Sequence, residues 1–125
     1  MINFIIDTSK EKIFLKIINN SKEYINKVNN SRENLDELVN IIFNFLEEVK
    51  ISLSKIDNIF INQGPGKYTS IRSAISIVKA LKTSKNINIY GYYSSQITNN
   101  DYNTLLKLLE EGRLTKDYIQ PKYSK

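Results

Sequence analysis

The first thirty residues contain short apolar runs whose composition is typical of β-strands. Turn-rich stretches of Asp, Ser, Asn and Lys separate them. The pattern predicts strands over 2–6, 13–18 and 24–28, joined as an antiparallel meander. Two later runs, 58–62 and 87–93, predict two further strands of the same sheet.

Residues 35–49 have apolar positions at the helical period of about 3.6. The preceding Asn34-Leu-Asp-Glu37 resembles a capping box that opens a helix. The apolar arc of this helix covers roughly 200°, more than the ~100° stripe needed to lie on one surface. We therefore expect the helix to have two neighbours. The residues at this period are Leu35, Leu38, Val39, Ile42, Phe45, Leu46 and Val49, and Ile41 and Phe43 widen the arc.

Residues 70–83 predict a second helix, and residues 105–111 a shorter third one that Gly112 ends. Beside the apolar stripe of the second helix runs another line of mostly small side chains. Small side chains let another helix approach closely. This second line consists of Ser73, Ser76, Ile77 and Ala80.

The order of these elements predicts an α/β fold with a mixed five-stranded sheet and helices on at least one face. Its 125 residues are enough for one core. We expect a domain over 1–97, followed by a C-terminal helix and tail over 98–125. No internal repeat is visible.

The composition excludes several classes of enzyme. The chain has no Cys and no His, so disulfides, thiol nucleophiles, Cys/His zinc sites and Ser-His-Asp triads are absent. No apolar run approaches the roughly 20 residues that span a bilayer, and the first residues lack the basic region of a signal peptide. We expect a cytoplasmic protein that does not contact membranes.

The net charge of +5 is unevenly distributed. Residues 66–125 contain 10 basic and 4 acidic side chains, and no acidic residue lies between Asp57 and Asp101. The basic side chains of this stretch are a possible contact surface for an acidic protein or for phosphates, or simply a solvated helix face. They are Lys67, Arg72, Lys79, Lys82 and Lys85.

The segment Gly64-Pro-Gly66 lies between a predicted strand and a predicted helix. Such a turn directs main-chain N–H groups toward the helix N-terminus, where an anion is favoured. It is not a P-loop, because Ile61 and Tyr68 occupy positions that the P-loop pattern reserves for Gly and for Ser or Thr. The alternative is a structural turn with Thr69 as the helix cap.

Asp7, Thr8 and Ser9 follow the first strand, where they could hold a metal-bound phosphate. A hairpin corner also favours these residue types, because their side chains bond the local main chain. Both interpretations remain open from the sequence.

Four segments together resemble the TsaB (YeaZ) family in order and approximate spacing. The most specific is Gln63-Gly-Pro-Gly-Lys-Tyr-Thr-Ser-Ile-Arg72, which is similar to the family's GPGSFTGLR signature. Ser70 stands where the signature has the Gly that follows its Thr. The signature loop comprises Gly64, Pro65, Gly66, Lys67, Tyr68, Thr69, Ser70 and Arg72. The other three are Phe4-Ile-Ile-Asp-Thr-Ser9, Leu53-Ser-Lys-Ile-Asp57 and Gly91-Tyr-Tyr-Ser-Ser95.

This resemblance implies half of an actin-like (ASKHA, RNase H-like) fold, formerly classed as a glycoprotease homologue. It implies a non-catalytic subunit that helps to make threonylcarbamoyladenosine beside the tRNA anticodon, with no cofactor of its own. Family members carry a second actin-like half. Residues 105–114 and Pro121-Lys-Tyr123 look like the family's closing helix and tail, so the chain looks internally deleted.

The resemblance also implies the partners. The catalytic subunit TsaD is expected to bind the two long helices, with the ATPase TsaE in a larger complex and tRNA contacted indirectly. A homodimer could use the same helices. The expected interface residues are Leu38, Ile41, Ile42, Phe45, Ser73, Ser76, Ile77 and Ala80.

Two other functions remain open from the sequence. One is a residual nucleotide-binding actin-like domain, in which Asp7, Thr8 and Ser9 form a vestigial phosphate site. The other is a basic RNA-binding module, although the chain contains only three Arg residues.

Overall fold

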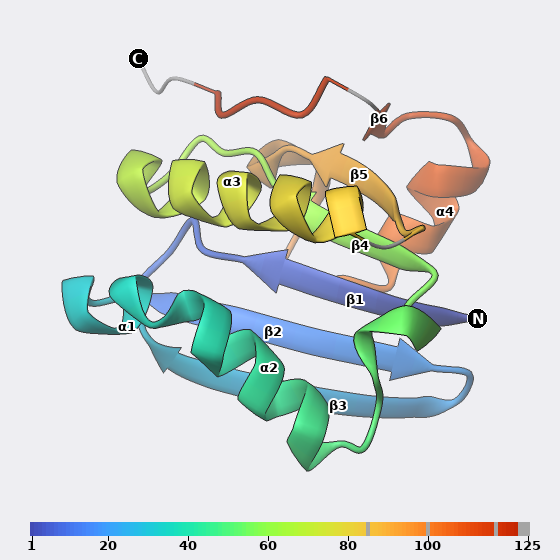
Figure 1. Cartoon of the computed structure of the whole chain (residues 1–125). Helices are drawn as coiled ribbons and strands as arrows, with labels where there is room; N and C mark the ends of the chain where they lie inside the picture. Colours follow the sequence, from blue (N-terminus) through green and yellow to red (C-terminus); the bar gives the residue numbers. More distant parts are fainter. Residues whose placement is uncertain (85, 100, 117, 123–125) are drawn as a thin grey trace.

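The computed structural model describes residues 1–84, 86–99, 101–116 and 118–122. Within them the chain forms one mixed sheet of six strands in the order β3-β2-β1-β4-β5-β6 (Figure 1). The strands are β1 (Ile2–Asp7), β2 (Lys12–Asn19), β3 (Lys22–Asn29), β4 (Asn58–Asn62), β5 (Asn88–Tyr92) and β6 (Thr115–Lys116). The helices are α1 (Arg32–Asp36), α2 (Leu38–Glu48), α3 (Tyr68–Ser84) and α4 (Thr104–Glu110), with 3-10 turns η1 (Leu53–Lys55) and η2 (Ser94–Gln96).

The predicted meander is confirmed. β1 pairs with β2 and β2 with β3, both antiparallel, while β4 pairs parallel to β1 and β5 parallel to β4. All five predicted strands lie in this one sheet, within two residues of their expected bounds. The sequence missed β6, because a two-residue strand has no pattern of its own.

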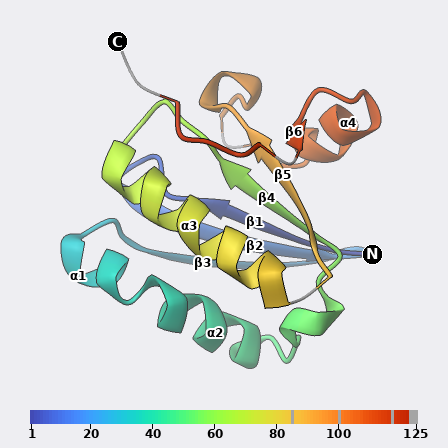
Figure 2. The ribbon, with the colours of Figure 1, turned by 45° about the horizontal axis from the view of Figure 1, so that its top comes forward.

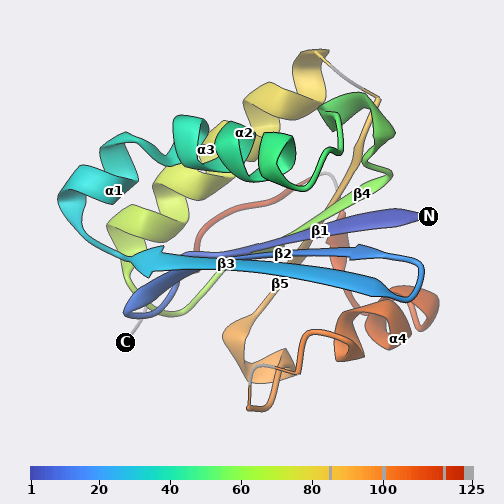
Figure 3. The ribbon, with the colours of Figure 1, turned by 90° about the horizontal axis from the view of Figure 1, so that it is seen from below.

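Helices cover both faces of the sheet. In Figures 2 and 3, α1, α2 and α3 lie on one face, which we call the helical face, and α4 lies on the opposite face. Residues that alternate along the strands therefore enter two separate clusters. On β1, Phe4 and Ile6 belong to the core under α2 and α3, while Ile5 packs toward α4.

The predicted helix over 35–49 is two helices. Ser31, not Asn34, caps the first, because its hydroxyl accepts a hydrogen bond from the Asn34 main-chain N–H at 3.2 Å. Glu37 leaves the helical conformation with a ψ of 14° and separates α1 from α2. The capping-box prediction is therefore wrong by three residues, and Glu37 is a junction between helices.

The residues after α4 return to the sheet. β6 pairs antiparallel to β5, Ile119 is buried in the core under α3, and the Lys122 N–H donates to the Gln63 carbonyl at 2.7 Å. The expected tail thus docks on the domain as far as Lys122. Tyr123, which the sequence likened to the family's Pro-x-Tyr ending, lies outside the described residues.

Candidate functional site

Three of the four segments that carry the resemblance meet at the carboxyl ends of β1, β4 and β5; the fourth, residues 53–57, precedes β4 at the opposite end of the strands. Asn62, the last residue of β4, connects the three: its amide nitrogen donates to Ser9 Oγ at 3.1 Å, and its amide oxygen accepts from the Gly64 N–H at 2.7 Å. Ser94 Oγ lies 2.9 Å from the Pro65 carbonyl and 3.2 Å from the same Asn62 oxygen. The structure therefore joins all three loops through one buried amide.

The signature loop is pressed against the loop that follows β1. The Lys67 N–H donates to the Ser9 carbonyl at 3.0 Å, and a Cβ on Gly66 would overlap that same oxygen. Gly64 has a φ of 101°, a conformation that glycine adopts readily. The glycines thus allow a close main-chain approach, which supports the structural interpretation of this turn. Thr69, the expected helix cap, lies inside α3, which begins at Tyr68.

Asp7 is the carboxylate at the centre of this region, and it is almost fully buried. Its Oδ1 accepts from the Ser9 N–H at 2.9 Å and from the Ser9 hydroxyl at 2.6 Å. Its Oδ2 accepts from the Tyr102 hydroxyl at 2.8 Å. Burial, followed by the Asp7 charge, raises the pKa of Tyr102 and that of Tyr92 well above their ordinary values.

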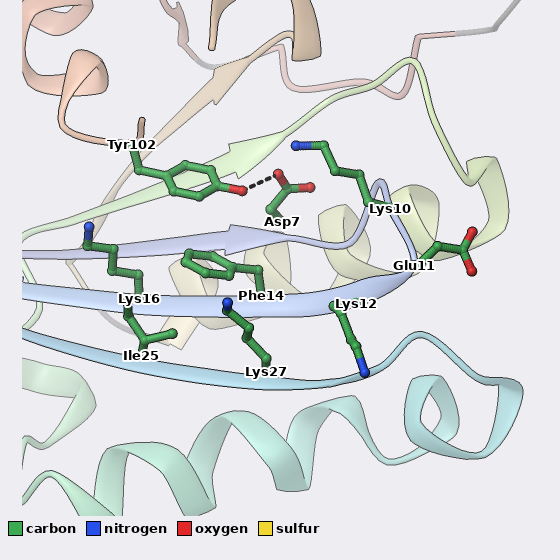
Figure 4. Close-up of a pocket in the computed structure, with 9 residues that line it drawn as sticks. All are labelled: Asp7, Lys10, Glu11, Lys12, Phe14, Lys16, Ile25, Lys27 and Tyr102. Atoms are coloured by element: carbon green, nitrogen blue, oxygen red, sulfur yellow. Dashed lines mark hydrogen bonds between the residues drawn. The ribbon is translucent and has the colours of Figure 1, made fainter. Parts of the chain in front are cut away.

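A cavity of about 430 Å³ opens beside Asp7, on the face opposite α2 (Figure 4). Its floor contains the stacked rings of Phe14 and Tyr102, whose centroids are 4.7 Å apart. Four lysines contribute to its lining, and Lys16 is buried in an ion pair with Glu23 at 2.9 Å. The lining residues are Asp7, Lys10, Glu11, Lys12, Phe14, Lys16, Ile25, Lys27 and Tyr102.

This cavity combines an aromatic floor with a cationic rim, an arrangement that suits an aromatic or aliphatic anion. Asp7 brings a negative charge, yet both of its oxygens are engaged by Ser9 and Tyr102. Within the described residues, no three His, Cys, Asp or Glu side chains converge as metal ligands. Thr8, predicted with Asp7 and Ser9 as a phosphate site, is buried, and its hydroxyl has no partner among the described residues.

Ser70, where the family signature has glycine, has a structural partner. Its hydroxyl donates to Asn30 Oδ1 at 2.9 Å. The Asn30 amide nitrogen donates in turn to the Thr8 and Lys10 carbonyls at 2.9 and 2.8 Å. Asn30 therefore joins the loop after β1, the end of β3 and the start of α3.

Three of the eight predicted interface residues belong to the core. Leu38, Ile42 and Phe45 of α2 are at most 2% exposed and pack under the helix. They are unavailable to a partner, because the chain's own sheet and neighbouring residues cover this part of the apolar arc of α2. Ile41 is half-buried, and the more exposed apolar side chains of α2 are Val39 and Phe43.

The predicted residues of α3 lie on its outer side. Ser76 and Ala80 are exposed, and Ser73 and Ile77 are half-buried. A cleft of about 460 Å³ separates this part of α3 from Leu35 of α1. The basic residues Lys67, Arg72, Lys79 and Lys82 are exposed too, whereas Lys85 lies outside the described residues.

Sequence reasoning missed the residues that hold the loops together. The sequence patterns do not single out Asn30, Asn62 or Tyr102, and they include Gln63 only as the first residue of the segment that resembles the family signature. Gln63 bonds the Tyr92 carbonyl through its N–H and the Gln120 carbonyl through its side chain. An Asn or Gln at the end of a strand is a weak signal, because these residues are equally common in solvated turns.

The family model described as TsaD, tRNA N6-adenosine threonylcarbamoyltransferase, matches residues 12–100. No curated protein matches the chain.

No helix within the described part of the chain is long and apolar enough to cross a membrane.

Solved structures share the fold. YeaZ from Pseudomonas aeruginosa superposes with a TM-score of 0.70 at 20% identity, covering 90% of this chain and 52% of that one. A protein similar to peptidase YeaZ from Pseudomonas aeruginosa gives 0.68 at 23%, covering 74% and 43%. RuvC from Thermus thermophilus, bound to a Holliday junction, gives 0.55 at 14%, covering 99% and 84%. The predicted actin-like, RNase H-like fold class is confirmed, and the chain spans about half the length of the YeaZ structures.

Proposed function

Because the chain belongs to the TsaD family and has a YeaZ-like fold, we propose that it is a non-catalytic subunit of the tRNA threonylcarbamoyladenosine system. In this role it binds the catalytic TsaD subunit and supports the transfer of a threonylcarbamoyl group to the adenosine beside the anticodon. TsaE and tRNA complete the assembly without direct chemistry from this chain.

The non-catalytic role is supported by the residues present. The chain has no His, so it offers no imidazole as a metal ligand or as a general base. Asp7, the buried carboxylate of the site, is held by Ser9 and Tyr102. These hydrogen bonds support a structural role for Asp7, in which it holds the loop after β1 against Tyr102.

The observation that carries the partner proposal is the outer side of α3. Its sheet-facing residues are buried, while Ser76 and Ala80 are exposed and Ser73 and Ile77 are half-buried. Small side chains at helical spacing allow a second helix to approach closely. The cleft between α1 and α3 lies next to this surface and gives room for a partner side chain.

The test is co-purification of this chain with the TsaD of the same cell, for the wild type and for Ala80→Glu. The added carboxylate would be desolvated in a close helix contact, so the variant should stay folded and lose TsaD. Ser95→Glu adds the same charge at an exposed position in η2 and should bind normally. A wild-type chain that does not capture TsaD would contradict the function, whereas normal capture by folded Ala80→Glu would contradict only this interface.

The cavity beside Asp7 supports a second candidate, a residual nucleotide-binding domain. Lys12 and Lys27 lie at its rim, and Phe14 provides an aromatic surface. Calorimetry with ATP tests this candidate directly. Titration with bare tRNA at two salt concentrations tests the RNA-binding alternative, because phosphate contacts weaken steeply with salt.

A further inference from the structure

The outer edge of the sheet is formed by β3, a regular strand of eight residues. Figure 3, which looks onto this edge, shows no other segment alongside its outer side. A strand in this position presents unpaired N–H and C=O groups that can pair with another strand. Ile25, in its middle, is 53% exposed although it is apolar.

The register of the β2–β3 hairpin identifies the free main-chain groups. The Asn30 N–H donates to the Glu11 carbonyl at 2.9 Å, so Asn30 and Glu11 form a hydrogen-bonded pair. Hydrogen-bonded and non-hydrogen-bonded pairs alternate along an antiparallel ladder. The main-chain groups of Glu23, Ile25 and Lys27 therefore point away from β2.

A side-chain contact supports this assignment. The Asn29 carbonyl, which points outward in the same register, accepts a hydrogen bond from the Asn34 side chain at 2.9 Å. This bond closes the edge at one end. Among the residues that the structure describes, no hydrogen bond engages the outward main-chain groups of Glu23, Ile25 or Lys27.

We propose that β3 pairs antiparallel with β3 of a second copy of this chain, with Ile25 facing Ile25 at the two-fold axis. In this register Glu23 of each copy lies opposite Lys27 of the other. The Ile25–Ile25 pair and the two Glu23–Lys27 pairs are hydrogen-bonded pairs, and each exchanges two main-chain hydrogen bonds. The two sheets then continue as one across a self-complementary interface.

Charge complementarity favours this register over the registers shifted by two or four residues. Moving the pairing by two residues places Lys27 opposite Ile25 and removes both charge pairs. A further shift places Lys27 opposite Lys27, and like charges facing each other destabilise a sheet. In the proposed register Glu23, which already contacts Lys16 at 2.9 Å, lies between two lysines of different subunits.

This inference does not depend on the proposed function, because β3 and the outer side of α3 belong to different parts of the molecule. The interface consists mainly of two strand edges and is smaller than the roughly 1,600 Å² of a standard stable complex. We therefore expect a weak dimer whose population rises with concentration.

Amide hydrogen exchange by NMR is the most specific test. As concentration rises, the N–H groups of Glu23, Ile25 and Lys27 should become protected. Those of Tyr24 and Asn26 bond β2 in the monomer and should change little. Sedimentation equilibrium on the same samples should show a monomer–dimer equilibrium. A chain that stays monomeric up to about 1 mM would overturn the proposal.

Proline substitution tests the direction of the main-chain groups. Ile25→Pro removes an N–H that points outward, so the monomer should keep its fold and lose the dimer. The matched Asn26→Pro removes an N–H that bonds β2 and should destabilise the monomer itself. A folded Ile25→Pro variant that dimerises like the wild type would contradict the pairing.

Charge exchange tests the register. Lys27→Glu should weaken the dimer about tenfold, because it places like charges opposite each other at two symmetric positions. Glu23→Lys alone removes the ion pair with the buried Lys16 and should also weaken the dimer. Combined with Lys27→Glu it puts opposite charges back across the interface, so the double variant should associate more tightly than either single variant. Lys22→Glu, the matched control on the same strand, changes the charge equally but lies opposite Val28 and should have a smaller effect. Failure of the double variant to recover, with the circular dichroism spectrum unchanged, would refute this register.

Discussion

Gly66 lies directly against the main-chain oxygen of Ser9, with no space between them for a side chain. This contact sets the distance between the signature loop and the loop after β1. Gly66→Ala should therefore destabilise the protein by about 1–3 kcal/mol, the usual cost of overpacking. Urea denaturation followed by circular dichroism gives the measurement.

Gly112→Asn is the control for Gly66→Ala. Gly112 has a φ of 67°, and a Cβ added there would meet no atom within 4 Å. Asn tolerates this conformation better than other residues with a side chain. Gly112→Asn should therefore destabilise the protein clearly less than Gly66→Ala. Equal losses for the two variants would show that the close approach of Gly66 to Ser9 does not limit stability.

Tyr102→Phe should cost about 1.5–3 kcal/mol of stability, because Asp7 loses a hydrogen bond to a buried charged oxygen. The ring stacked on Phe14 is retained, so the loss reports the hydroxyl alone. Tyr118→Phe, at a position 82% exposed, should change the denaturation midpoint little. An unchanged midpoint for Tyr102→Phe would mean that water replaces the lost hydroxyl without penalty.

Stability should fall in alkaline solution. The pKa values of Tyr92 and Tyr102 are raised in the folded protein, mainly by burial, whereas unfolded tyrosines ionise near pH 10. Above that pH the unfolded chain binds fewer protons, so the free energy of unfolding decreases by up to about 1.4 kcal/mol per pH unit for each tyrosine. Below about pH 9 this contribution is fully present.

Urea midpoints measured from pH 8 to about 11.5 test this dependence. The Tyr102→Phe variant should show a flatter decline than the wild type, because one of the two buried phenols is gone. Parallel curves for the two proteins would contradict the assignment of this dependence to Tyr102.

Asn30→Ala should remove three side-chain hydrogen bonds that join separate elements. We expect a loss of about 2 kcal/mol in the free energy of unfolding. Asn40→Ala is the control, because Asn40 is exposed and its side chain bonds to Glu37 on the same turn. The prediction is wrong if both variants unfold at the same urea concentration.

The strands could be predicted because apolar residues such as Ile13 and Ile59 occur in short runs bounded by turns. The break between α1 and α2 could not, because the apolar period continues through Glu37 without Gly or Pro. Ser31 and Asn34 are both good caps, and only the path of the chain from β3 decides between them.

The candidate site was predictable only in part. Its glycines and Asp7 stand in recognisable local patterns, whereas Tyr102 acts on Asp7 from a distant segment. Burial was also misjudged for α2, where Phe45 packs against Phe4 at a centroid distance of 6.1 Å. A wide apolar arc does not reveal whether a partner or the chain's own sheet covers it.

The hydrogen bond between Lys122 and Gln63 has a consequence for synthesis of the protein. A nascent chain emerges from the ribosome with its N-terminal elements first. β1 to β5 and α3 are then available before β6 and Ile119, so the outer edge of β5 stays open and the Gln63 carbonyl lacks this partner. This edge is covered, and the Gln63 carbonyl bonded, only when residues 115–122 dock.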